Sequence, residues 1–222
     1  TLHGEHGQKI QLILNGDILD MTGSWVGPVL PWDDVAEDSE IESMVLITLQ
    51  RILENNRAIV AEWSQFIQHP NTEIYYVVGN HDIMLEYYES AQQLFRQHLT
   101  LDPSQQKRIH FVEKFVSDEL SLYVEHGHQL DPFNHTSSRD VYALGDYVNI
   151  LLVNRFVERV STKLVGDGFT TALIEDIREQ LHDIEYLRPL ALIPLWIESV
   201  ANRYKNHPEN KSKPYPIDPI IR

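Results

Sequence analysis

The sequence predicts a mixed α/β fold, because a strand-like run, a polar motif and a helical stretch follow one another twice. The strand-like runs are 9–14 (KIQLIL) and 73–78 (EIYYVV), and their β-branched and aromatic residues are typical of buried strands. A third observation is that carboxylate, amide and imidazole side chains come directly after these strands. In α/β folds, loops at strand ends are where metal and phosphate sites are usually built.

The first strand run ends at Asn15-Gly16 and is followed by Asp17 and Asp20. A long helix is then expected over 37–68, where apolar residues keep helical spacing. Either Asp38 or Ser39 could cap its start, and Pro70 follows its end.

The second strand run leads into Gly79-Asn80-His81-Asp82, and a helix over about 84–98 comes next. Two more strands are expected at 109–115 and 119–124, with Ser117-Asp118 as the turn between them. The second of these leads into His126-Gly127-His128. We favour His126 over His128 as a ligand because it is the one that follows the strand directly.

The C-terminal third is predicted to be helical from about 138 to 204. Gly166 and Gly168 interrupt the pattern, further helices are expected over 171–185 and 190–204, and Pro194 is expected to kink the last one. The domain boundaries predicted in this way are a core at 1–134, a helical cap or insertion at 135–206 and an extended tail or linker at 207–222.

Composition excludes several classes of function. The chain of 222 residues has no cysteine, so disulfides, thiolate nucleophiles and zinc-thiolate sites are ruled out. Its net charge of −15 argues against a nucleic-acid partner, although bound divalent cations can reverse the charge of a site locally. No apolar run has the length of a transmembrane span and no signal-like segment is present, so a cytoplasmic protein is expected.

The three motifs carry the residue types that phosphoester cleavage needs. A pair of divalent ions can activate a water and clamp phosphate oxygens, and a strand-end carboxylate such as Asp17 can bridge the two ions. Asn80 offers a neutral oxygen ligand, and His126 offers an imidazole nitrogen. His81 could protonate the leaving oxygen, with Asp82 orienting its ring.

The order Gly-Asp-x-x-Asp, Gly-Asn-His-Asp and a His-Gly segment after a strand resembles the calcineurin-like metallophosphoesterase family over residues 9–134. The resemblance implies a two-sheet α/β sandwich, flanked by helices, with two divalent metal ions, commonly Mn, Fe or Zn. It also implies roles for six residues: Asp17 as bridging ligand, Asn80 and His126 as further metal ligands, His81 and Asp82 as catalytic histidine and its orienting carboxylate, and Asp20 as support behind them.

Two motifs of that family are absent. An Asp-x-His segment should precede Asp17 and a Gly-His-x-His segment should follow the helical region, so we expect the chain to be a fragment. Leu130 occupies the place where a second histidine would be needed after Gly127-His128. One ion would then have Asp17, Asn80 and His126 as ligands. The neighbouring ion would have Asp17 as its only ligand. The helical region resembles the cap of UDP-2,3-diacylglucosamine pyrophosphohydrolases, which implies a lipid-linked or other large substrate.

The predicted function is therefore metal-dependent hydrolysis of a phosphoester or pyrophosphate bond in a phosphate-containing small molecule or lipid-linked substrate. The alternative is a non-catalytic binding or scaffold module that keeps the fold without a complete metal centre, and the two absent motifs favour that alternative. A nuclease is a further rival that the acidic composition disfavours. The sequence leaves the substrate, the metal and the oligomeric state, including a homo-oligomer, open.

Overall fold

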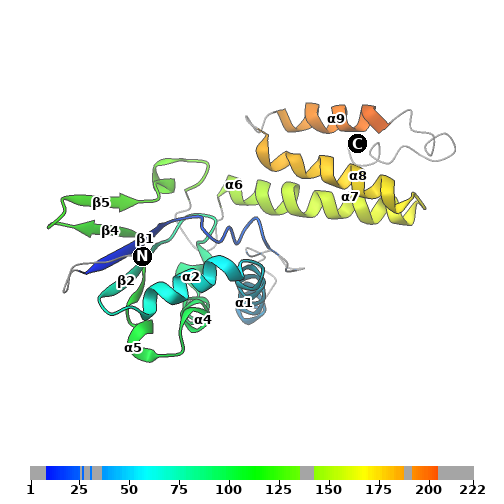
Figure 1. Cartoon of the computed structure of the whole chain (residues 1–222). Coiled ribbons are helices and arrows are strands. Elements are labelled where there is room, and N and C mark those ends of the chain that lie inside the picture. Colours follow the sequence, from blue (N-terminus) through cyan, green and yellow to red (C-terminus); the bar gives the residue numbers. More distant parts are fainter. Residues whose placement is uncertain are drawn as a thin grey trace. The chain divides into compact units, whose positions relative to one another are not determined.

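The computed structural model describes residues 9–25, 27, 31, 37–135, 143–187 and 192–204. The chain divides into two compact units, Thr1–Asp146 and Tyr147–Arg222, and each is described by itself (Figure 1). The division comes after Asp146, whereas the sequence placed the end of the core at 134. The expected tail at 207–222 lies outside the described residues.

The first unit is built on a parallel sheet of three strands in the order β1-β2-β3. The strands are β1 (Ile10–Asn15), β2 (Thr72–Val77) and β3 (Ile109–Val112). The register aligns Ile13 with Tyr75, and Tyr75 with His110. The central strand β2 is the most deeply buried, as expected for a parallel strand covered on both faces. The mixed α/β class predicted from the sequence is thereby confirmed.

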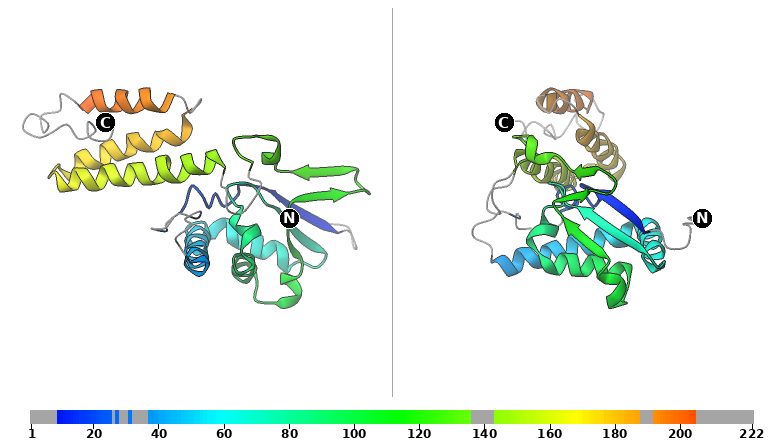
Figure 2. Two further views of the ribbon diagram at one scale, coloured as in Figure 1. Left: turned by 180° about the vertical axis from the view of Figure 1, so that it is seen from behind. Right: turned by 90° about the vertical axis from the view of Figure 1, so that its left-hand side faces the viewer.

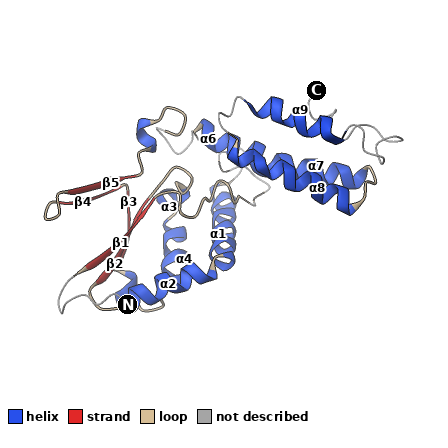
Figure 3. Ribbon diagram, turned by 45° about the horizontal axis from the view of Figure 1, so that its top comes forward, coloured by secondary structure: helices blue, strands red, loops and turns tan. Residues whose placement is uncertain are grey.

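A second, antiparallel sheet consists of β4 (Lys114–Ser117) and β5 (Leu122–Glu125) (Figure 3). The prediction of one strand over 109–115 was wrong. The run divides at Glu113, so that β3 ends the parallel sheet and β4 begins the hairpin. A continuous β-type run shows no sign that its two ends belong to different sheets.

Alternate side chains of β2 face different layers. The Tyr76 ring packs against Phe95 of α4 with ring centroids 5.7 Å apart. Its neighbour Tyr75 faces the other side, where it stacks on His110 and meets Phe115 of β4 edge-on, with centroid distances of 4.6 and 4.8 Å. Helices therefore cover one face of the parallel sheet and the hairpin lies on the other, as the views in Figure 2 show.

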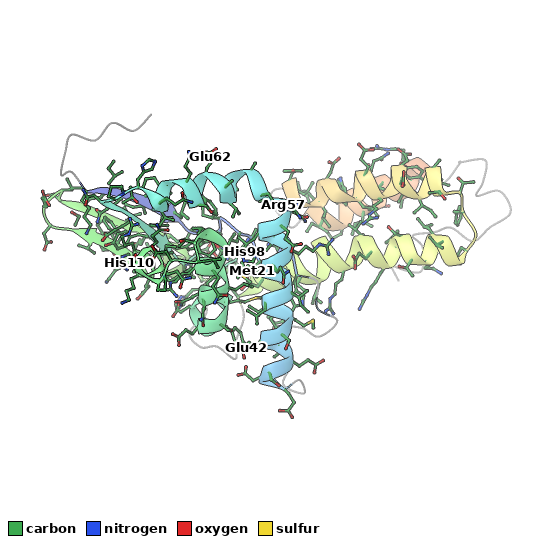
Figure 4. All side chains as sticks on the ribbon, turned by 60° about the horizontal axis from the view of Figure 1, so that its bottom comes forward. Met21, Glu42, Arg57, Glu62, His98 and His110 are labelled. Carbon is green, nitrogen blue, oxygen red and sulfur yellow. The ribbon has the colours of Figure 1, made fainter. Side chains whose placement is uncertain are left out.

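The helices that link the parallel strands are shorter than predicted. They are α1 (Asp38–Asn55), α2 (Arg57–Gln68), α3 (Met84–Tyr87), α4 (Glu89–Leu99) and α5 (Pro103–Gln106). The expected helix over 37–68 breaks at Asn56, whose side-chain amide donates to the carbonyl of Ile52 at 2.8 Å. The residue that precedes α1 as its N-cap is Glu37, not Asp38 or Ser39. Figure 4 shows Glu62 on the outer, exposed side of α2.

The second unit is helical. A short helix α6 (Leu144–Tyr147) spans the division between the units, and the following elements are η2 (Val148–Asn154, a π-helix), α7 (Arg155–Gly166), α8 (Thr171–His182), η3 (Asp183–Tyr186) and α9 (Ile193–Tyr204). Apolar residues of α7, α8 and α9 form one core. The expected kink at Pro194 is wrong, because Pro194 lies in the first turn of α9, where its missing N–H costs no helical hydrogen bond. No helix among the described residues is long and apolar enough to cross a membrane.

Arg108 fastens the end of α2 to the start of β2. Its guanidinium donates to the carbonyl oxygens of Ile67 and His69, and to both the carbonyl and the hydroxyl oxygen of Thr72. These carbonyls are thus hydrogen-bonded where the chain passes from α2 into the central strand β2. One side chain satisfies several backbone acceptors that the helix end would otherwise leave open.

We expect Arg108→Ala to lower the free energy of unfolding by about 2–3 kcal/mol, because it removes a charged donor from several partly buried acceptors at once. Urea denaturation followed by circular dichroism measures this. Arg51→Ala, at an exposed position on α1, is the matched control and is expected to change stability by no more than about 0.5 kcal/mol. Equal midpoints for the two variants would contradict the anchoring role of Arg108.

Candidate metal and phosphate site

The candidate site lies at the carboxyl edge of the parallel sheet. Asn15 and Val77 are paired at the ends of β1 and β2, so the two following motifs leave the sheet side by side. Asp17 has φ 51° and Gly16 has φ 70°, which turns the chain sharply after β1. The left-handed backbone is costly for most residues, although aspartate tolerates it better than most. A strained carboxylate at a strand end is the kind of feature that is often associated with function.

The Asp17 carboxylate connects all three motifs. One oxygen, Oδ1, accepts a hydrogen bond from the backbone N–H of His81 at 2.9 Å. The other, Oδ2, lies 3.2 Å from Nε2 of His126. The structure therefore brings together Asp17, His81 and His126, which the sequence selected from three distant segments.

Two glycines make this approach possible. A Cβ at Gly79 would lie 2.2 Å from Oδ1 of Asp17, and a Cβ at Gly16 would lie 2.2 Å from the His126 ring. Either distance is far inside van der Waals contact, so any side chain at these positions would displace the site residues. The glycine in each motif is explained by the close passage of the backbone.

We expect Gly79→Ala to destabilise the protein by about 1–3 kcal/mol, because the new methyl group would overlap the Asp17 carboxylate. Gly166→Ala is the matched control, since a Cβ at that end of α7 meets nothing within 4 Å. There the exchange should be neutral or stabilising by up to about 1 kcal/mol. Thermal unfolding of the two variants compares them directly, and similar melting temperatures would refute the overlap.

His81 is held by Asp20 and not by Asp82. Nδ1 of His81 lies 2.9 Å from Oδ1 of Asp20, which also accepts the backbone N–H of Gly23. Burial alone would lower the pKa of His81, but the hydrogen bond to Asp20 and the charges of Asp17, Asp20 and Asp146 outweigh it and raise the pKa to about 9. The ring is therefore protonated at neutral pH and can donate a proton.

The expectation that Asp82 orients His81 is corrected by the contacts of the Asp82 carboxylate. Its Oδ2 accepts from the Tyr76 hydroxyl at 2.6 Å and from the backbone N–H of Ile18 at 2.9 Å. Its Oδ1 is buried and accepts no hydrogen bond from the described residues. Burial, reinforced by the charges of Asp17 and Asp20, raises the pKa of Asp82 to about 6. Asp82 thus ties the loop after β1 to the core of β2.

His126 follows β5, and Gly127 turns the chain with φ 92° so that His128 folds back onto it. The Nδ1 atoms of the two histidines are 3.1 Å apart, which allows one ring to donate to the other. His128 is buried, and burial followed by the charge of His126 lowers its pKa. Through this contact between the Nδ1 atoms, a neutral His128 can fix the tautomer of His126. The other ring nitrogen of His126, Nε2, then faces Asp17. The sequence left His128 without this role.

Asp146 belongs to the site and was missed from the sequence. It is fully buried, its Oδ2 accepts the backbone N–H of Ala143 at 3.2 Å, and the charges of His81 and Asp17 act on its pKa. Burial raises its pKa to about 6. No signal in the sequence marks it, because position 146 lies off the helix face that carries Leu144 and Val148, where a carboxylate is expected to be exposed.

The donor set has the chemistry of a cation site. Two ligand atoms on a metal at about 2.1 Å are separated by about 3.0 Å in octahedral and about 3.4 Å in tetrahedral geometry, and the 3.2 Å between Asp17 Oδ2 and His126 Nε2 lies in this range. Asn80 is 4% exposed and adds an amide oxygen. No group of three or more His, Asp or Glu side chains in the described ranges is arranged to hold a metal ion by itself.

Comparison of the chain with protein-family models, with curated proteins and with solved structures finds no match.

Proposed function

We propose that the protein is a metal-dependent hydrolase of phosphoester or pyrophosphate bonds, with the calcineurin-like arrangement of Asp17, Asn80 and His126 as metal ligands. The observation that carries this proposal is the Asp17 carboxylate, which is shared between the backbone of His81 and the ring of His126. Hard oxygen and imidazole ligands at one sheet edge suit Mn, Fe or Zn. A pair of such ions, when bound, would activate a water and take up charge on the phosphoryl oxygens.

His81 is the general acid in this proposal, and Asp20 is its orienting carboxylate. The pKa of His81 is raised to about 9, which favours a protonated ring at neutral pH, and the side chain is 26% exposed, so a substrate can approach it. Asp20 holds Nδ1, so Nε2 is the nitrogen that would donate to the leaving oxygen. Asp82 acts beneath the site by fixing the loop that carries Asp17 and Asp20.

The proposal extends to the fold and the substrate. The second, antiparallel sheet supports a two-sheet metallophosphoesterase sandwich for the first unit. The helical second unit is proposed as a cap for a phosphate-containing or lipid-linked substrate. The acidic composition favours a cation between protein and phosphate, since it would offset the repulsion between like charges.

The test is elemental analysis of the purified chain together with hydrolysis of bis-p-nitrophenyl phosphate with and without Mn²⁺. We expect bound transition metal and turnover that depends on Mn²⁺. Hydrolysis of p-nitrophenyl phosphate in parallel distinguishes a diesterase from a monoesterase. A chain that binds no metal and shows no turnover would overturn the proposal and favour a scaffold module.

A further inference from the structure

The ring of His126 is held on three sides. Its tip, Nε2, lies 3.2 Å from Oδ2 of Asp17, and its Nδ1 lies 3.1 Å from Nδ1 of His128. Its Cδ2 edge faces Gly16, where an added Cβ would lie 2.2 Å from that carbon. Both ring nitrogens thus meet polar partners, and a carbon edge meets the backbone. A ring turned over about its Cβ–Cγ bond would place carbon atoms against both Asp17 and His128.

His128 is suited to be the fixed member of this histidine pair. It is 9% exposed, and Gly127 turns the chain with φ 92° so that the His128 side chain returns to His126. The centroids of the two rings are 5.3 Å apart and their planes are inclined by 46°, so the rings meet at their nitrogens and do not stack. A Cβ at Gly127 meets nothing within 4 Å, so the backbone conformation, and not crowding, favours glycine there.

A histidine that binds a cation needs a partner for its second nitrogen. A neutral imidazole has one proton, so a cation on Nε2 of His126 requires that proton to be on Nδ1. In metal sites this N–H group donates to an acceptor, and loss of that acceptor weakens metal binding. Nδ1 of His128 lies at hydrogen-bond distance from this position and can be the acceptor.

We propose that His128 is a positioning residue of the candidate site, which holds Nδ1 of His126 so that Nε2, and not a ring carbon, faces a cation beside Asp17. The inference rests on the proposed function, because the cation is the one for which Asp17 and His126 are ligands there. Affinity for the cation then depends on a hydrogen bond from a residue that does not bind it. The left-handed turn at Gly127 is the backbone feature that brings this residue into place.

The contact is tested first in the metal-free chain, by a long-range ¹H–¹⁵N spectrum of the histidine rings. The His126 signals are identified by their absence in His126→Gln. In His128→Leu the Nδ1 signal of His126 should move, because its partner is lost. In His128→Asn, which has nearly the shape of leucine but offers an amide in place of Nδ1, the signal should move less. His69→Leu, at an exposed position, is the control and should leave it in place.

The role is tested next by Mn²⁺ titration followed by electron paramagnetic resonance. We expect His128→Leu to weaken Mn²⁺ binding about 10- to 100-fold, the usual loss when the partner of a metal ligand is removed. His128→Asn should bind Mn²⁺ more tightly than His128→Leu, because its amide can still pair with Nδ1 of His126. The two variants are matched in size, so their difference measures the hydrogen bond.

A second pair of variants tests the turn and keeps His128 itself. Asparagine tolerates a left-handed backbone, whereas β-branched valine adopts it only at high cost. We therefore expect Gly127→Val to weaken Mn²⁺ binding and to move the Nδ1 signal of His126, and Gly127→Asn to have the smaller effect on both. If His128→Leu does not fold, this pair still decides whether the placement of His128 matters, and equal effects of the two variants would contradict it.

The outcomes separate this inference from the proposed function. A wild-type chain that binds Mn²⁺ while His128→Leu binds equally well would overturn the inference alone. Equal weakening in His128→Leu and His128→Asn would also overturn it, because packing and not the hydrogen bond would then matter. A wild-type chain that binds no Mn²⁺ would overturn both.

Discussion

Asp17→Ala is expected to abolish the binding of Mn²⁺, the largest effect of any single change in the site. The Asp17 carboxylate is in contact with both neighbouring motifs, through the His81 N–H and the His126 ring. Alanine removes the negative charge and leaves Asn80 and His126 without the anionic ligand between them. Two neutral ligands cannot replace a carboxylate for a hard divalent cation.

Elemental analysis and a Mn²⁺ titration measure this loss. Asp17→Asn keeps the shape and the acceptor for the His81 N–H, so its expected weakening isolates the contribution of charge. Asp118→Asn, in the exposed hairpin turn, is the matched control for a lost surface carboxylate and should bind as the wild type does. Unchanged metal content in Asp17→Ala would mean that the cation is held elsewhere, and the proposed function would have to be abandoned.

His81→Gln is expected to keep bound metal and to lower kcat by about 10²- to 10⁴-fold, the usual contribution of a general acid. The residue contributes its backbone N–H to Asp17, which glutamine retains, and its ring to Asp20. Metal binding and proton donation therefore depend on different parts of His81. The substitution removes only the second of them.

Turnover of bis-p-nitrophenyl phosphate at saturating Mn²⁺, with metal content measured on the same samples, separates the two parts. Asp20→Asn should give a smaller loss in kcat, because His81 keeps its ring but loses the carboxylate that holds it protonated. His69→Ala, at an exposed position after α2, is the control. Loss of metal from His81→Gln would reassign this histidine as a ligand.

The parallel strands could be predicted closely from the sequence. The runs at 9–14 and 73–78 became β1 and β2 with ends that differ by a single residue. Buried parallel strands are continuous apolar runs bounded by turn residues, so their pattern contains the necessary information. The helix breaks at Asn56 and Tyr88 could not be predicted, because apolar spacing continues across both.

Whether a site residue could be predicted from the sequence depended on its position relative to the strands. Asp17 and His81 follow neighbouring parallel strands, so their proximity follows from the strand order, and His126 joins them from the hairpin. The partner of His81 was misassigned to Asp82 because adjacency in sequence suggested it, whereas the backbone turn places Asp20 there. Asp146 comes from a helical segment whose position relative to the sheet no sequence pattern specifies.

The contacts of Asp82 have a consequence for how much ordering a ligand would require. Asp82 joins the Ile18 backbone, in the loop after β1, to Tyr76, whose ring is packed in the aromatic interior with Phe95. Fixing the backbone of a loop residue costs about 1–2 kcal/mol of conformational entropy. Here the loop is ordered when the protein folds, before any ligand binds. Binding of a ligand at Asp17 therefore does not have to order the loop, and more of the interaction energy appears as affinity.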